Sequence, residues 1–160
     1  MKFGANEMVD QSKLKLSETI QRIMKRYAMY SRYLNYPGEW GERAFRGWIV
    51  YEIFHAHLGW PLENIVFGER YDVLFVDNNV KPMVYLETKK PGRGLADIED
   101  FEERIPLYQT IRHAVLANGY EWLRIDVVAG ARESIKLADA DMKWNGFTRH
   151  LMAKNYIYGV

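Results

Sequence analysis

The 160-residue sequence predicts an α/β fold in which helices flank a mixed central β-sheet. Three observations predict it. Apolar residues recur at helical spacing over the first third of the chain, the pattern then changes to short runs typical of strands, and a longer segment before the last strands again has helical length. The expected order is an N-terminal helix, a second helix, three strands, a helix and two strands, which favours packed layers of sheet and helix.

Two helices are expected first. Apolar residues spaced three or four apart predict a helix over about residues 12–34, which the Tyr36-Pro37-Gly38 sequence ends. A second apolar stripe predicts a helix from about residue 40 to residue 57. Leu58-Gly59-Trp60-Pro61 stops this helix, because glycine suits a helix C-terminus and proline does not continue a helix.

For the rest of the chain the sequence predicts strands, with one helix between the third and the fourth. Asp77-Asn78-Asn79 is a turn cluster between two strand patterns, and a helix is expected over about residues 98–118. Residues 138–160 are expected to form a short helix and an irregular tail. Five strands are expected, at residues 65–67, 71–76, 82–89, 122–128 and 133–137.

The composition excludes several classes of protein. The sequence has no cysteine, so disulfides, thiolate metal sites and a catalytic thiol are impossible. Its net charge of +1 argues neither for nor against nucleic acid, since a carboxylate site lowers the total while a local basic face remains. The N-terminus lacks the apolar run of a signal peptide, and no stretch approaches about 18 apolar residues, so we expect a cytoplasmic protein without membrane contact.

A group of charged residues ends one of the expected strands. Side chains alternate along a strand, so Glu87 and Lys89 share a face. Asp72 begins the preceding strand, and a hairpin through residues 77–79 would bring it beside Glu87. Two carboxylates at one sheet edge are hard oxygen ligands that suit Mg²⁺, while Lys89 can orient water or neutralise charge on a phosphate. The plain alternative is a solvated ion pair between Glu87 and Lys89.

These residues and their surroundings resemble the PD-(D/E)xK nuclease superfamily, although Tyr71 stands in place of the motif's proline. The segment Glu87-Thr88-Lys89-Lys90-Pro91-Gly92 is similar to the continuation found in N-terminal nuclease domains of type I restriction subunits and fused restriction-modification enzymes. The matches elsewhere are Glu42-Arg43-Ala44-Phe45-Arg46, Leu58-Gly59-Trp60, Leu107-Tyr108-Gln109 and Asn118-Gly119-Tyr120-Glu121-Trp122.

The resemblance implies a restriction-endonuclease-like fold with an αβββαβ core and an extra N-terminal helix. It implies catalytic roles for Asp72, Glu87, Lys89, Glu42 and Gln109, with Asp72, Glu87 and Glu42 as ligands of Mg²⁺, for which Mn²⁺ can substitute. Glu42 has an alternative role as a first-turn acid favoured by the helix dipole, and Gln109 an alternative as a surface residue. Lys90, Arg93, Arg43 and Arg46 are candidate DNA contacts, although each has an alternative role as a solvated charge.

The expected function is hydrolysis of DNA phosphodiesters by a metal-dependent endonuclease, as the cleavage module of a restriction system. The alternatives are a catalytically silent DNA-binding or protein-interaction module with the same fold, and a structure-specific nuclease or junction resolvase. We expect one domain, acting as a homodimer or within a larger restriction-modification polypeptide. Its parts are an N-terminal extension (1–38), a nuclease core (39–137) and a C-terminal helix and tail (138–160).

Overall fold

The computed structural model describes residues 15–34, 39–68, 72–92, 94–95, 98–105 and 109–159. At some positions inside helices and strands, Asp72 among them, it describes only the backbone. All structural statements below concern these residues.

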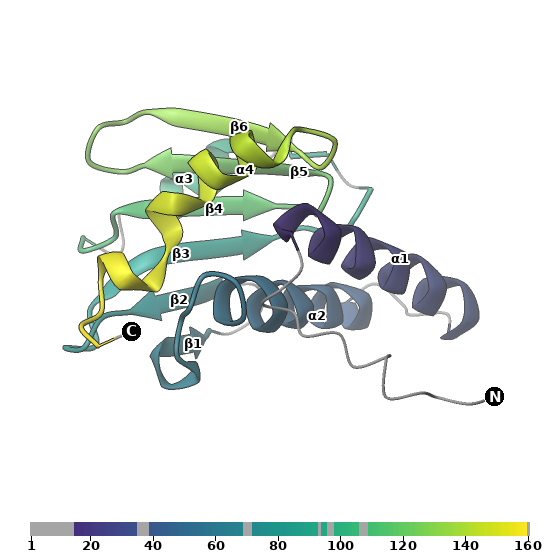
Figure 1. Cartoon of the computed structure of the whole chain (residues 1–160), viewed down its shortest axis with the longest axis horizontal. Coiled ribbons are helices and arrows are strands. Elements are labelled where there is room, and N and C mark those ends of the chain that lie inside the picture. Colours follow the sequence, from purple (N-terminus) through teal and green to yellow (C-terminus); the bar gives the residue numbers. More distant parts are fainter. Residues whose placement is uncertain are drawn as a thin grey trace.

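A six-stranded mixed sheet forms the centre of the fold, with the strands in chain order from β1 to β6 (Figure 1). Neighbouring strands are antiparallel except β3 and β4, which are parallel. The parallel pair is connected through a helix, as parallel neighbours require. The strands are β1 (Ile65–Phe67), β2 (Asp72–Val76), β3 (Pro82–Thr88), β4 (His113–Ala117), β5 (Glu121–Asp126) and β6 (Arg132–Lys136).

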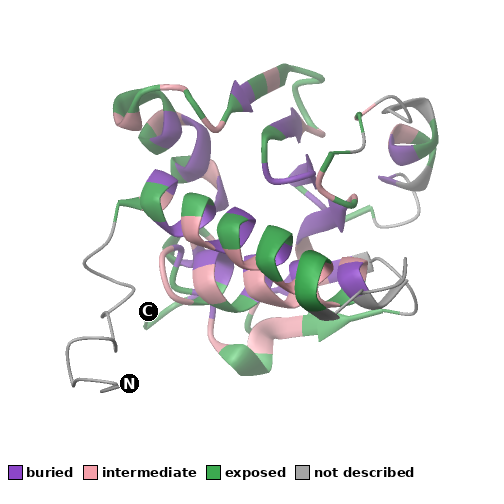
Figure 2. Ribbon diagram, turned by 90° about the vertical axis from the view of Figure 1, so that its right-hand side faces the viewer, coloured by how far each residue is buried: buried purple, intermediate pink, exposed green. Residues whose placement is uncertain are grey.

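Helices cover both faces of this sheet, and the two faces carry separate apolar clusters (Figure 1). Helices α1 (Leu16–Leu34), α2 (Glu39–Trp48) and α4 (Asp141–Thr148) lie on one face, which we call the α1/α2 face. The much shorter α3 (Ile98–Arg104) lies on the other, the α3 face. Buried positions face inward between these layers, and the outer sides of the helices are exposed (Figure 2).

The two helices expected before the strands are confirmed over the described residues. The second differs in one respect, because α2 continues into a π-helical segment, η3 (Ile49–His55), that buries four apolar side chains. Phe54 of η3 stacks on Phe75 of β2 with ring centroids 4.3 Å apart. The Trp60 indole N–H donates to the backbone oxygen of Leu151 at 2.8 Å, which ties the end of this segment to the C-terminal region.

The predicted hairpin between β2 and β3 is also confirmed. The Oδ1 atom of Asp77 accepts hydrogen bonds from the backbone N–H groups of Asn79 and Lys81, at 2.8 and 3.0 Å. Such side-chain bonds to the backbone two residues on stabilise turns. The hairpin brings the start of β2 beside the end of β3.

The helix predicted over residues 98–118 is confirmed over residues 98–104 and wrong over residues 113–117. Helix α3 ends at Arg104, and residues 113–117 form β4, a strand that the sequence analysis missed. All five residues of β4 are buried, because the strand lies between β3 and β5 with both of its faces covered. A central strand of this kind is apolar throughout and shows no alternation.

The C-terminal region confirms the expected short helix followed by irregular chain. Helix α4 continues into two single-turn 3₁₀ segments, η6 (Arg149–Leu151) and η7 (Ala153–Asn155). None of the helices in the described ranges combines the length and hydropathy needed to cross a membrane.

Candidate active site

Asp72 and Glu87 are directly opposite each other in the antiparallel pairing of β2 with β3. Cα atoms of facing residues in such a pair are about 4.5–5.5 Å apart, and facing positions share one side of the sheet. The structure describes the backbone of Asp72, and this backbone fixes which residue of β3 lies opposite it. That position is the one at which the sequence analysis expected the two acids to meet.

Glu87 is fully buried on the α3 face of the sheet. Its neighbour two residues back on the same face, Tyr85, stacks on Phe101 of α3 with ring centroids 5.6 Å apart. Leu86, which lies between them in sequence, packs in the cluster of the opposite face. The alternation expected for this strand is therefore confirmed up to Glu87, and it places a carboxylate inside an otherwise apolar layer.

Lys89 follows the last residue of β3 and remains attached to the sheet. Its backbone N–H donates to the oxygen of Ala117 at 2.8 Å, which extends the parallel pairing with β4 by one step. The Lys89 side chain is half-buried, and Lys90 is exposed. Arg93 lies outside the described residues. Lys89 is thus held two residues from Glu87 on a well-anchored backbone.

Glu42, Arg43 and Arg46 are on α2, whose buried Phe45 packs into the α1/α2 face. Glu42 and Arg46 are half-buried and Arg43 is exposed. Helix α2 contacts β3, but the apolar cluster into which α2 packs is on the opposite face of the sheet from Glu87. No described contact joins Glu42 to Glu87, so its role as a third ligand stays a prediction.

Gln109 is not brought to the site. It was expected on a helix, but it lies exposed in a turn before β4. The neighbouring Thr110 donates from its hydroxyl to the oxygen of Pro82 at 2.6 Å, which fixes this turn beside the first residue of β3. Glu87 is five residues further along β3, about 16 Å away at about 3.3 Å per residue. Extending the predicted helix too far along the chain, which hid β4, also misplaced Gln109.

A hollow of about 330 Å³ lies at β5 and β6, two strands away from Glu87, which does not line it. The register continues from Asp72 and Glu87 through Leu116 and Leu123 to Ser134, so these five positions form one row across the sheet. The last two line the hollow, together with Glu121, Lys136 and, from the chain after β3, Leu95.

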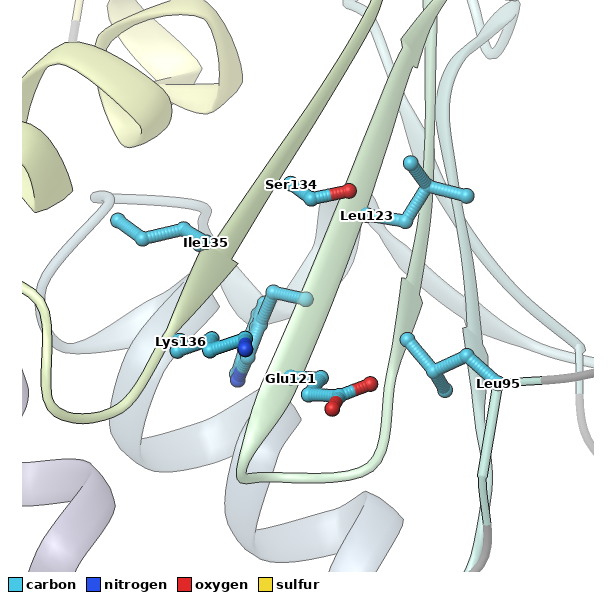
Figure 3. Close-up of a pocket in the computed structure, with 7 residues that line it drawn as sticks. Leu95, Glu121, Leu123, Ser134, Ile135 and Lys136 are labelled. Atoms are coloured by element: carbon cyan, nitrogen blue, oxygen red, sulfur yellow. The ribbon is translucent and has the colours of Figure 1, made fainter.

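Figure 3 shows Leu95 and Leu123 on one side of the strands and Ile135 on the other. Strand β5 is two strands from β3, about 10 Å at about 4.8 Å per strand. The lining of this hollow comes from three separate segments, so no local pattern in the sequence predicts it.

The side chains at this site determine which metal ion could bind there. Among the side chains that the structure describes, no three His, Asp or Glu residues form a group that could hold a cation. The pair Asp72 and Glu87 offers oxygen ligands only, and Mg²⁺ is commonly bound by one or two carboxylates with water and substrate oxygens completing its shell. The residues present therefore fit Mg²⁺ and do not fit a zinc site built from several protein ligands.

Comparisons of the chain with protein-family models, with curated proteins and with solved structures found no match in any of the three. The strand register and the residues themselves are thus the observations from which a function can be inferred.

Proposed function

We propose that the chain is a divalent-metal-dependent endodeoxyribonuclease of restriction-endonuclease-like fold, the cleavage module of a restriction system. The observation that carries the proposal is the register of β2 and β3, in which Asp72 faces Glu87. The order of β2, β3, α3 and β4, with β3 parallel to β4, is compatible with the αβββαβ core that the sequence resemblance implies.

The chemistry follows from burial and charge. An ionised carboxylate removed from water at Glu87, facing a second acid, is costly unless cations compensate it. Asp72 and Glu87 would together hold one Mg²⁺, which when bound supplies polarisation of a phosphoryl oxygen. Lys89, anchored through Ala117, orients the attacking water and offsets the negative charge that builds on the phosphate.

Substrate contacts are expected along the α3 face. Exposed Lys90 continues the chain directly from the site and is the described cation best placed to meet a neighbouring DNA phosphate. The hollow beside Leu123 lies in line with the acids and offers an apolar floor with polar groups at its rim.

The test is cleavage of supercoiled plasmid in Mg²⁺ or Mn²⁺, followed by gel electrophoresis. We expect nicking or linearisation by the wild-type chain, none by Asp72→Asn or Glu87→Gln, and strongly reduced cleavage by Lys89→Met. Glu63→Gln is the matched control, because Glu63 is an exposed acid before β1 and outside the site. A four-way junction substrate in parallel separates a junction resolvase from a plasmid endonuclease.

Calorimetry measures whether the same variants still bind the metal ion, independently of cleavage. Asp72→Asn and Glu87→Gln should abolish it, and Lys89→Met should leave it intact because an ammonium group is no metal ligand. Cleavage that survives in all three variants would remove the assignment of this site. Absence of both cleavage and metal binding in the wild-type chain would favour the catalytically silent module.

A further inference from the structure

A second hollow, of about 420 Å³, lies away from the candidate acids at the other end of β3. One of its walls is His113, the first residue of β4, which pairs with Val84 near the beginning of β3. Val84 packs on the α1/α2 face, whereas Glu87 is on the α3 face. The other walls come from the C-terminal segment: Arg149, His150, Met152, Lys154, Asn155 and Tyr156.

Hydrogen bonds hold the C-terminal wall in shape. Asn155 donates from Nδ2 to the oxygen of Arg149 at 2.7 Å, and the Tyr156 hydroxyl donates to the oxygen of His150 at 2.8 Å. The ring of Tyr156 also stacks on Trp60 with centroids 5.8 Å apart. The backbone that carries the polar side chains is therefore preorganised, and a ligand would not have to order it.

The tautomer of His113 is set by its neighbour. Arg124 has only donors, and its Nη1 lies 3.1 Å from Nδ1 of His113, so this ring nitrogen must accept. The proton of the neutral ring is then on Nε2, the nitrogen left for a ligand. The residue is only 8% exposed, and burial together with the Arg124 charge lowers the pKa of His113 to about 4, so its ring stays neutral at pH 7.

The charges around this hollow are predominantly positive. Arg149 and Lys154 are exposed cations in its lining, and none of the described lining residues is acidic. Two acids lie nearby, and both are engaged: Glu133 accepts from Arg124 at 2.6 Å, and Asp126 accepts from the N–H groups of its own turn. The His150 ring faces His113 with centroids 5.3 Å apart.

We infer that this hollow binds a phosphate group, either free or at the end of a small nucleotide. The Nε2–H of His113 and the cations Arg149 and Lys154 are donors from two separate parts of the chain that converge on one opening. Charge-assisted hydrogen bonds of this kind are the usual way in which proteins hold phosphate oxygens. The inference is independent of the nuclease proposal, because it uses none of the same residues.

The experiment is calorimetric titration of the full chain with inorganic phosphate and, separately, with adenosine 5′-monophosphate at neutral pH and low salt. We expect saturable binding, which Arg149→Gln/Lys154→Gln weakens about tenfold or more through the loss of two charged contacts. Lys25→Gln/Lys81→Gln removes the same charge from exposed positions elsewhere and should change the affinity less than about twofold.

Ring resonances of the histidines in NMR spectra provide the second reading. Phosphate should shift those of His113 and His150 and leave His55 unchanged, since His55 is outside the hollow. Equal affinities for phosphate and the monophosphate would identify the phosphate alone as the ligand, and tighter binding of the monophosphate would identify a nucleotide. The inference is overturned if neither ligand binds at millimolar concentration, or if both double variants weaken binding equally.

Discussion

Substitution of Gly119 by alanine tests how closely the helices approach the turn between β4 and β5. Gly119 has a φ of 92°, a conformation that side chains with a Cβ rarely adopt. An added Cβ would overlap Sδ of Met24 on α1 and would lie 3.2 Å from Cζ of Phe45 on α2. Met24 is 6% exposed and Phe45 is fully buried, so neither the Met24 thioether nor the Phe45 ring can move freely away from the added Cβ.

The expected loss has two parts. Left-handed backbone at a residue with a Cβ costs about 1–2 kcal/mol, and overpacking against two buried side chains adds about 1–2 kcal/mol. Gly119→Ala should therefore lower the free energy of unfolding by about 2–4 kcal/mol. Urea denaturation followed by tryptophan fluorescence measures this as a shift of the midpoint at unchanged slope.

Gly146 is the matched control, because it lies in α4 with no atom near its missing Cβ. Gly146→Ala should raise stability by about 0.5–1 kcal/mol, the ordinary gain of alanine over glycine inside a helix. A loss below about 1 kcal/mol in Gly119→Ala would refute the close packing of α1 and α2 on this turn.

Three further predictions follow from individual contacts. Lys89→Met should reduce DNA cleavage by about 10²–10³-fold, the usual effect of removing one transition-state donor, and a wild-type rate in a single-turnover assay would contradict it. Trp60→Phe leaves the buried oxygen of Leu151 without its donor and should cost about 1–3 kcal/mol in urea denaturation; an unchanged midpoint would speak against that bond. The pKa of His113 is about 4 in the folded chain and 6.5 in the unfolded chain. Because the unfolded chain takes up the proton more readily, the stability of the fold decreases as the pH falls from 6.5 towards 4. Between pH 7 and 4.5 the wild-type chain should lose about 2 kcal/mol more stability than His113→Gln, and equal losses would exclude this coupling.

The region up to residue 89 could be predicted well because each of its signals is local. Apolar spacing defined α1 and α2, and the Asp77 turn joined two strands whose alternation fixes which side chains face which side. A one-residue irregularity between Phe75 and Val76 sets Asp72 directly opposite Glu87, and counting residues from the turn does not predict it. The hairpin by itself still brings the two acids to the same edge of the sheet. The candidate acids were therefore within reach of the sequence alone.

The region from residue 105 to residue 117 was predicted poorly because its signals depend on tertiary context. The run Ala114–Ala117 is apolar without alternation, a pattern that a buried strand and a buried helix share. Pro106 was the overlooked signal, since proline in a helix interior removes a hydrogen bond and clashes with the preceding turn. The cluster of His113, Arg124 and His150 carried no signal, because only folding brings its members together.

The central claim is that Asp72 and Glu87 hold one divalent cation between β2 and β3. A crystal of the chain grown with Mn²⁺ tests it most directly, through anomalous difference density recorded near the manganese absorption edge. The account predicts one strong peak within about 2.1–2.2 Å of a carboxylate oxygen from each residue, absent from crystals of Glu87→Gln. Density elsewhere on the chain, or full-occupancy Mn²⁺ bound without either residue, would contradict it.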